Sequence, residues 1–326
     1  MRPRNNHADV GLCRNPRQAC HLLIARAFMV LLVAGLCGAP AHAQTGDFDW
    51  NGSLAQELAP GVLHAHVQVT DPRPLNINVL RIDTEAPGVG FFTTPRHDPW
   101  IAGSHETTRQ TTRSFVAESQ STDRPLVAAV NANVFDFTSP HTNLLGLAIS
   151  DGTLVSPPQS RPSLRIDEAG NASMATTHVG DDLSGIDTAV SGFAFHLSNG
   201  NPIGPFVNLE PRTGIGLSEN GRYVYFMTID GRQPGFSEGA SEGEVGVWLR
   251  HFGAFNGINM DGGGSTTMAS WNRATSGTGL LNSPSGAERA VGNNIGVYVP
   301  EPASAGMLLL AWVFLARRCC RIDRSI

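Results

Sequence analysis

The side chains best suited to chemistry lie in one short stretch, residues 259–267, where an acid precedes three glycines and three hydroxyl residues. In order, the candidate residues are Asp261, Gly262, Gly263, Gly264, Ser265 and Thr266. Glycine adopts positive φ and lets another group approach the backbone, and successive amides in such a turn can form a concave anion-binding nest. A tight glycine turn between two strands is the alternative. The adjacent acid favours a functional site, although the stretch matches neither GxxxxGK[ST] nor GxGxxG.

Further charged candidates stand at the ends of predicted strands. Asp230 and Arg232 follow the strand predicted at 223–229, and Arg212 and Thr213 open the strand that pairs with it in a hairpin. Facing residues of paired strands lie about 5 Å apart, so we expect Arg212 and Asp230 to be neighbours. An exposed ion pair in a turn is the alternative.

Two weaker candidates lie elsewhere. Asn131 follows a predicted buried strand at 126–130 and begins a segment with a second amide and Asp136, which suits sugar hydroxyls or a metal. Asn is also a common turn residue. Arg289 precedes the last predicted strand, 293–299, and with Glu288 it can also be read as a solvated charge pair.

Several site classes find no support. The histidines show no HExxH spacing and there is no GxSxG motif. The five cysteines all lie before residue 44 or after residue 299, so the part between contains no disulfide, cysteine-based zinc site or thiol nucleophile. No cofactor is predicted, and a divalent metal is left open. A net charge of −5 without a basic stripe argues against nucleic acid as a partner.

Both ends of the chain have the composition of targeting segments. Arginines precede an apolar run at 27–36, and Ala41-His42-Ala43 is typical of a signal-peptidase site, so we expect residues 1–43 to be a signal peptide. Near the other end, Pro300-Glu301-Pro302 precedes an apolar run at 303–316 and an arginine cluster. That order resembles the PEP-CTERM sorting signal, which implies removal by an exosortase; a plain membrane anchor is the alternative. We therefore expect an exported protein at the bacterial cell surface, in the outer membrane or outside the cell.

The sequence pattern of the intervening residues, 44–298, is typical of one β-rich domain. Alternating or apolar runs predict strands, and Asp151-Gly152 is a strong hairpin signal. A helix is predicted at 241–251, where Ser241 and Glu244 form a capping box, and a second at 107–119. Residues 180–187 are expected to be a loop. The pattern predicts a single α+β domain with a mixed or antiparallel sheet and few helices.

Four ordered motifs resemble the phosphodiester glycosidase family, which includes the lysosomal uncovering enzyme. They are RTGIGL from Arg212, TIDGR ending at Arg232, GINMDGGGSTT around Asp261 and NSPSGAERAVGN around Arg289. Upstream, VNANVF from Val130 is similar to the family's segment, although glycine is commoner where Ala132 and Asn133 stand. The resemblance covers roughly residues 126–299. It implies a hydrolase that releases a sugar from a sugar-1-phosphodiester, and the targeting segments add that the enzyme is exported.

Such cleavage commonly uses two carboxylates, and Asp230 and Asp261 are the best pair in the sequence. The expected substrate-binding residues are Asn131, Arg212, Thr213, Arg232, Gly262, Gly263, Gly264, Ser265, Thr266 and Arg289. The competing hypothesis is a surface carbohydrate-binding or exopolysaccharide-assembly protein without turnover. An aromatic content of 7 % offers few stacking platforms for sugar rings, and this favours the enzyme. The partners expected are a phosphorylated carbohydrate, signal peptidase and exosortase.

Overall fold

The computed structural model describes residues 47–136 and 141–299. These residues belong to one compact unit, Thr45–Ile326. The expected signal peptide and the expected sorting tail with its apolar run at 303–316 lie outside the described residues. Within the described ranges no helix has both the length and the apolar character needed to cross a bilayer.

The largest sheet has eight strands, and neighbours in it are antiparallel. In spatial order they are β1 (Ala55–Ala59), β2 (Val62–Val69), β3 (Leu75–Asp83), β16 (Tyr223–Ile229), β15 (Arg212–Leu217), β17 (Asn256–Asn259), β13 (Ala194–Ser198) and β14 (Asn201–Pro202). The predicted hairpin is confirmed, since Arg212 pairs with Ile229 and Leu217 with Val224.

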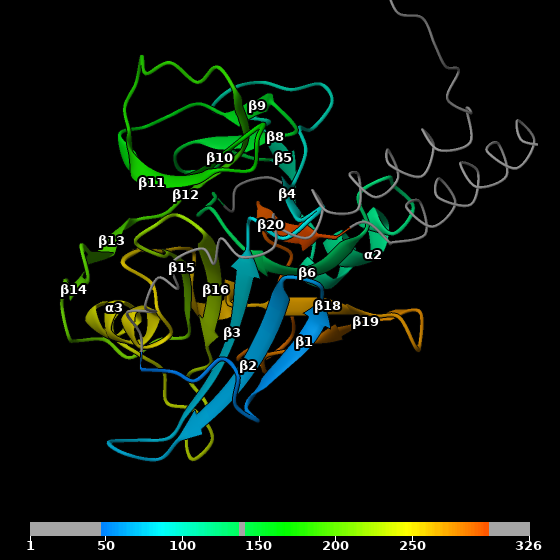
Figure 1. Ribbon diagram of the computed structural model, residues 1–326. Coiled ribbons are helices and arrows are strands. Elements are labelled where there is room, and N and C mark those ends of the chain that lie inside the picture. Colours follow the sequence, from blue (N-terminus) through cyan, green and yellow to red (C-terminus); the bar gives the residue numbers. More distant parts are fainter. Residues whose placement is uncertain (1–46, 137–140, 300–326) are drawn as a thin grey trace, which may run out of the picture. The chain divides into compact units, whose positions relative to one another are not determined.

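Two five-stranded sheets complete the framework (Figure 1). One contains β11 (Ala172–Thr177), β10 (Arg161–Asp167), β12 (Ile186–Ser191), β8 (Ala148–Ser150) and β9 (Thr153–Ser156). The other contains β19 (Gly277–Leu280), β18 (Met268–Asn272), β6 (Leu126–Asn131), β20 (Asn294–Tyr298) and β4 (Gly90–Thr93). A short ribbon pairs β5 (Thr107–Thr108) with β7 (His141–Thr142).

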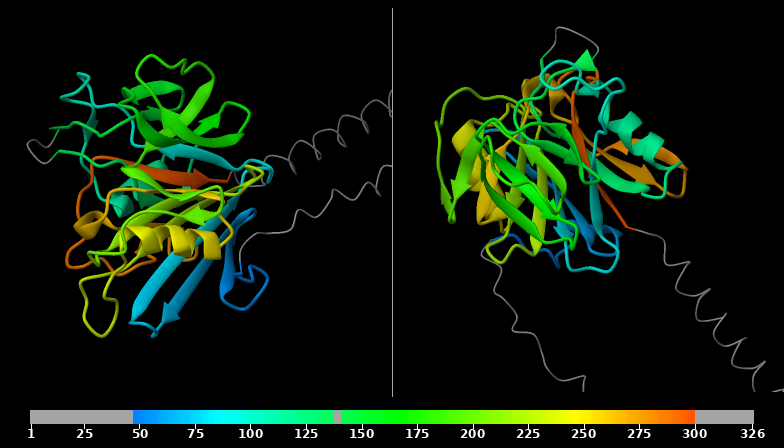
Figure 2. Two further views of the ribbon diagram at one scale, coloured as in Figure 1. Left: turned by 90° about the vertical axis from the view of Figure 1, so that its left-hand side faces the viewer. Right: turned by 90° about the horizontal axis from the view of Figure 1, so that it is seen from above.

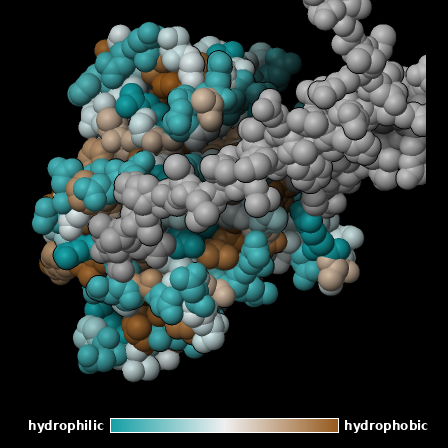
Figure 3. All heavy atoms as spheres, viewed as in Figure 1, coloured by the Kyte–Doolittle hydropathy of each residue, from teal (hydrophilic) through white to brown (hydrophobic). Residues whose placement is uncertain are grey.

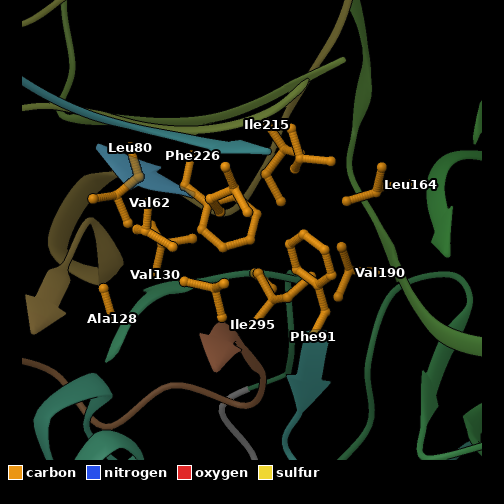
Figure 4. Packing of buried hydrophobic residues seen from close by; sticks show 14 of the residues in the cluster. Val62, Leu80, Phe91, Ala128, Val130, Leu164, Val190, Ile215, Phe226 and Ile295 are labelled. Carbon is orange, nitrogen blue, oxygen red and sulfur yellow. The ribbon is translucent and has the colours of Figure 1, made fainter. Parts of the chain in front are cut away.

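One hydrophobic core joins all three sheets. Figure 4 shows Leu80 and Phe226 of the eight-stranded sheet close to Val130 and Ile295 of the β6 sheet. Leu164 and Val190 bring the β10 sheet into the same cluster. A core shared by segments from residue 59 to residue 299 holds strands distant in sequence in a fixed arrangement.

The middle of the eight-stranded sheet is buried on both faces. Along β16, Val224 and Phe226 point into the shared core, whereas Tyr225 and Met227 point to the opposite face. That face is covered by α3 (Glu242–His251), drawn in yellow in Figure 2. Burial on both sides explains why 223–229 reads as a continuous apolar run.

Two helices occur in the described ranges, and each has a local cause. The capping box of α3 is confirmed, because Ser241 accepts from the Glu244 amide and Glu244 accepts from the Ser241 amide. Two glycines lie inside this helix, and packing requires them. A Cβ on Gly246 would lie 1.8 Å from the His196 carbonyl oxygen, and one on Gly243 would lie 2.6 Å from the Phe206 ring.

The expected helix at 107–119 is wrong in its first turn. Thr107–Thr108 pairs with β7 as a strand, and α2 (Thr112–Ser119) begins where the Thr111 hydroxyl accepts a hydrogen bond from the Ser114 amide. Successive β-branched threonines favour the extended conformation. The expected loop 180–187 ends early, because Ile186 already pairs with Asp167. The described chain is sheet-rich with few helices, and every strand pairing in it is antiparallel.

Candidate functional site

The glycine loop lies where two sheets meet. At the end of β17 the Met260 amide donates to the Thr213 carbonyl of β15. One residue later the Asp261 amide donates to the Ala132 carbonyl, just past β6. The chain thus passes from the eight-stranded sheet to the β6 sheet within two residues. The Met260 amide binds one sheet and the Asp261 amide binds the other, so the backbone of Asp261 is fixed at the junction between them.

Each glycine of the loop makes room for a segment that carries an arginine. A Cβ on Gly262 would lie 2.9 Å from the Pro211 carbonyl oxygen, next to Arg212. A Cβ on Gly263 would lie 3.2 Å from Arg232 Nη2. A Cβ on Gly264 would lie 2.5 Å from Arg289 Nη2. Three segments distant in sequence therefore converge on three consecutive glycines, which explains why side chains are missing there.

The loop amides do not form the open anion nest that the glycines suggested. The Gly262 amide donates to Asp261 Oδ1 (3.0 Å) and the Gly263 amide to the Pro211 carbonyl (2.8 Å). The amides of Ser265 and Thr266 donate within the 3₁₀ turn η1 (Gly263–Ser265). These donors stabilise the loop itself. Positive potential for an anion therefore comes from the guanidinium groups.

Asp261 is a mostly buried acid with one unused oxygen. Oδ1 accepts from the Gly262 amide, whereas Oδ2 is shielded from solvent and accepts no hydrogen bond from the described chain. Burial raises the pKa of Asp261 to about 6, while the Ser265 side chain, the Gly262 amide and the Arg289 charge act in the opposite direction. A carboxyl with this pKa changes charge near neutral pH, as acid–base groups of enzymes do.

Asp230 has a different environment. It is 1 % exposed, and its carboxylate accepts from Asn76 Nδ2 (2.6 Å), Asn282 Nδ2 (2.8 Å) and the Ser283 amide (2.9 Å). Burial also raises its pKa, against these hydrogen bonds. Asn282 in turn donates to the Thr266 carbonyl and accepts from the Met268 amide. Asp230 therefore ties the end of the glycine loop to the eight-stranded sheet.

Arg212 and Asp230 are adjacent along paired strands but turn to opposite faces. Arg212 pairs with Ile229, whose side chain points toward α3. The next residue, Asp230, bonds to Asn76 on the other face, because successive strand residues alternate in direction. Arg212 instead donates to the carbonyls of Ala240 and Asn208. Contrary to the expectation, no hydrogen bond or ion pair in the described chain joins Arg212 to Asp230.

Four of the expected substrate-binding residues are buried. Asn131 Nδ2 donates to the Asp261 carbonyl (2.7 Å), and Asn131 Oδ1 accepts from the Thr213 hydroxyl (2.7 Å) and the Thr267 amide (3.0 Å). Asn131, Thr213 and Ser265 are each 0 % exposed, and Thr266 is 1 % exposed. These residues lie on the interior side of the glycine loop and support its backbone.

An open pocket of about 530 Å³ lies beside Asp261. Of the expected residues, Asp261, Arg212, Arg232, Gly262 and Gly263 line it. Asp230 and Arg289 are not among its lining residues, although Arg289 reaches within 3.5 Å of the Ser265 hydroxyl. Two of the three expected arginines and one of the two expected aspartates therefore line the pocket.

The remaining walls come from residues that the sequence did not single out, namely Phe193, Glu210, Glu242, Asn259 and Met260. Glu210 accepts from Arg232 Nε at 2.5 Å, and Glu242 lies 3.7 Å from Arg212 Nη1. Asn259 is 2 % exposed, and its Oδ1 accepts no hydrogen bond from the described chain. Glu210 stands two residues before the candidate Arg212, and this position was its only sequence signal. Glu242 lies in the first turn of the helix predicted at 241–251, where no pattern marked it as a site residue.

Arg232 has an unusual backbone. Its φ is +59°, in the left-handed region that few residues other than glycine adopt. The residues of the turn are held by bonds from the Arg232 amide to the Glu238 carbonyl and from the Gln233 amide to the Ser237 carbonyl. Such conformations persist where the surroundings enforce them, and they cluster at binding sites.

The described residues contain no cluster of three or more His, Cys, Asp or Glu side chains arranged to hold a metal. The amide of Asn133, which was a candidate ligand, is occupied. Its Nδ2 donates to the carbonyls of Leu145 and Leu147, and its Oδ1 accepts from the Ser191 amide and Asn293 Nδ2. Asn133 thus serves the packing of loops around β6.

A family model described as phosphodiester glycosidase matches residues 124–298. Comparison with curated protein sequences gives no match. Among solved structures, the catalytic domain of zebrafish N-acetylglucosamine-1-phosphodiester alpha-N-acetylglucosaminidase, auto-inhibited by its pro-peptide, is similar with a TM-score of 0.56 and 17 % identity, over 78 % of this chain and 87 % of that one. A hypothetical protein from Synechocystis has a TM-score of 0.55 and 15 % identity, over 73 % and 62 %. At these identities the likeness shows the fold.

Proposed function

The chain belongs to the phosphodiester glycosidase family, and from this premise we propose that it is an exported hydrolase that releases a sugar from a sugar-1-phosphodiester. One observation carries the proposal. Asp261, with an unused carboxylate oxygen, lines the same pocket as two arginines. An acid beside guanidinium groups suits a substrate with an anionic phosphate on the anomeric oxygen.

The arginines are arranged to receive that phosphate. Arg232 is 50 % exposed and its Glu210 partner 37 % exposed, so this ion pair contributes little to stability and can be exchanged for a substrate anion. Arg212 uses Nε and Nη2 to bind carbonyls, which orients Nη1 beside Glu242. A phosphate bound there replaces carboxylate contacts with charge-assisted bonds of its own.

The two unused oxygens suit the sugar. Asn259 and Asp261 both line the pocket, and Asn259 Oδ1 and Asp261 Oδ2 accept no hydrogen bond from the described chain. A buried acceptor without a donor is costly, and sugar hydroxyls or an attacking water supply donors. In this proposal Asn259 binds a hydroxyl of the sugar, and Asp261 faces the anomeric carbon or its attacking water.

Asp261 acts in its ionised form. Water adds to the anomeric carbon, the bond from that carbon to the phosphate oxygen breaks, and the phosphate monoester leaves with the electron pair. Asp261 either takes the proton of that water, or attacks the carbon first and forms an ester that the water then hydrolyses. The second pKa of a phosphate monoester is about 6, so the leaving group departs without strong protonation. Glu210 and Glu242 are the other carboxylates that line the pocket, and each is paired with an arginine that the phosphate would engage.

The test is turnover by the full-length protein on a panel of sugar-1-phosphodiesters. Asp261→Asn should lower kcat/KM by ~10²–10⁴-fold, the usual effect of losing an acid–base group. The matched control is Asp182→Asn, since Asp182 lies in an exposed loop. Wild-type kcat/KM should rise as pH increases through about 6, where Asp261 ionises. If Asp261→Asn retains full activity, the assignment is wrong; binding without release by the wild type would favour the carbohydrate-binding alternative.

A further inference from the structure

A cluster of exposed apolar side chains lies next to the pocket. The segment from Ile203 to Leu209 joins β14 to β15, and Figure 3 shows hydrophobic residues over the region after β14 and beside α3. We call the cluster the apolar rim; its members and their exposed fractions are Phe193 (43 %), Ile203 (42 %), Phe206 (61 %), Val207 (58 %) and Leu209 (41 %). Single exposed apolar residues are common, but a group of this kind marks a binding surface.

The apolar rim adjoins the pocket at three places. Phe193 itself lines the pocket. Leu209 precedes Glu210, another lining residue, and the Asn208 carbonyl accepts from Arg212 Nη2 (3.0 Å). The Phe206 ring lies against Gly243, the neighbour of Glu242. The apolar rim is therefore adjacent to the charged residues that line the pocket.

The segment is held in one conformation by backbone bonds. The Ile203 amide donates to the His196 carbonyl (2.9 Å) and the Gly243 amide to the Pro205 carbonyl (2.9 Å). Glu210 and Ala240 exchange a pair of bonds at 3.1 and 3.0 Å. A preorganised surface loses little conformational entropy when a ligand binds. Its apolar side chains are thus displayed by a fixed backbone.

We propose that the apolar rim binds the second ester group of the substrate, and that this group is an alkyl or aryl chain. The inference rests on the proposed function for the position of the phosphate, which has one ester to the sugar and one to a second group. With the sugar at Asp261 and the phosphate at Arg212 and Arg232, the second group extends toward the rim. The rim side chains carry no charge, and they gain by excluding water from an apolar chain.

A membrane surface is the less favoured partner. Glu210, Glu242 and Asp261 place three carboxylates in the pocket beside its two arginines, so the pocket mouth has no excess of positive charge to attract an anionic bilayer. A single chain can enter beside the carboxylates with only its phosphate near the arginines. The arrangement of charge therefore favours one apolar chain over a lipid surface.

Calorimetric titration of the full-length protein with methyl phosphate and with octyl phosphate, below its micelle-forming concentration, tests the inference without turnover. Octyl phosphate should bind at least ~10-fold more tightly, since each fully buried methylene contributes on the order of threefold in affinity. Replacing both Phe206→Ser and Val207→Ser should narrow that ratio to about threefold or less. The control Val179→Ser, at an apolar residue 76 % exposed and outside the pocket lining, should keep the wild-type ratio.

The outcomes separate this inference from the proposed function. Equal affinities for the two phosphates overturn the inference, even if a methyl sugar-1-phosphodiester is cleaved. An octyl preference that depends on Phe206 and Val207 supports it, even if no diester in the panel is cleaved. The last measurement is binding of the protein to vesicles of phosphatidylcholine with phosphatidylglycerol, which tests for a membrane surface as the partner. Loss of vesicle binding in the double variant with an unchanged octyl-to-methyl ratio would assign the rim to a membrane and overturn the inference.

Discussion

Asp261 and Asp230 are both acids whose pKa is raised by burial, yet their oxygens have different partners. Asp230 accepts three hydrogen bonds and lies outside the pocket lining. Asp261 lines the pocket and has one oxygen that accepts no hydrogen bond from the described chain. A carboxylate saturated by structural donors has little capacity left for substrate, so Asp261 is the better candidate for the chemistry. The expected catalytic role of Asp230 stays a prediction, and the geometry favours a positioning role.

The raised pKa of Asp261 predicts a pH-dependent stability. Because its folded pKa is about 6 and its ordinary value is 3.8, the folded chain binds the proton more tightly. The protonated carboxyl thus contributes stability in full below pH 3.8, and the contribution is lost as pH rises through about 6. The loss is up to ~3 kcal/mol. Urea unfolding from pH 4 to 8 should show a smaller decline in Asp261→Asn; equal slopes in both proteins would contradict the assignment.

Replacing Asp230 by asparagine should mainly harm the fold. Asparagine keeps one oxygen as an acceptor, so its NH₂ group would face either the Asn282 donor or the donors of Asn76 and Ser283, and a buried donor without an acceptor costs about 1–3 kcal/mol. We expect a lower Tm at pH 7 for Asp230→Asn. Asp261→Asn, at a site with an unused oxygen, serves as the comparison and should not show this loss. A stable Asp230→Asn variant without turnover would restore Asp230 as a catalytic candidate.

At the scale of elements, the site depends on short backbone approaches. The glycine loop, which includes η1, packs closely against three segments that carry arginines, because its glycines lack Cβ atoms. Helix α3 reaches β13 through Gly246, and this places Glu242 beside Arg212. The loop and the helix thus set the distances between charges in the pocket, while Asn131 and Asn282 hold the loop by side-chain bonds.

Gly264→Ala tests this dependence. Its Cβ would lie 2.5 Å from Arg289 Nη2, the movable end of a side chain, so the guanidinium should shift while the fold persists. The positive charge of Arg289 lowers the pKa of Asp261, and its displacement should move the midpoint of the pH–activity profile to higher pH. Gly279→Ala is the control, because no atom lies within 4 Å of its Cβ position. An unchanged midpoint in Gly264→Ala would remove Arg289 from the electrostatics of Asp261.

At the scale of the whole molecule, cohesion comes from a core shared by three sheets. Residues 44–299 contain no cysteine, so packing and hydrogen bonds hold the described chain without disulfides. The largest sheet also unites the early strands β1–β3 with the family-matched region through β16. Residues 47–123 are therefore part of the same folded unit as the family-matched region, although no sequence motif marked them.

The expected processing of the chain is a prediction about its ends. Pro300-Glu301-Pro302, the apolar run and the arginine cluster predict a sorting signal that is removed during export. Mass spectrometry of the native surface protein should give peptides that begin near Gln44 and none beyond about Pro302. Recovery of intact tails containing Arg317 and Arg318 would favour a plain membrane anchor.

The sequence by itself determined the β-rich class, the hairpin at 212–229, the capped helix and the glycine loop, because each depends on local periodicity, turn chemistry or capping within a few residues. It also placed Arg212, Arg232 and Arg289 around that loop through ordered family motifs. Only the tertiary structure decided which way each side chain points. The alternation of β16 directs Asp230 away from Arg212, and helix packing brings Glu242 to the pocket. Burial and hydrogen-bond saturation arise from segments far apart in the chain, so no local pattern records them.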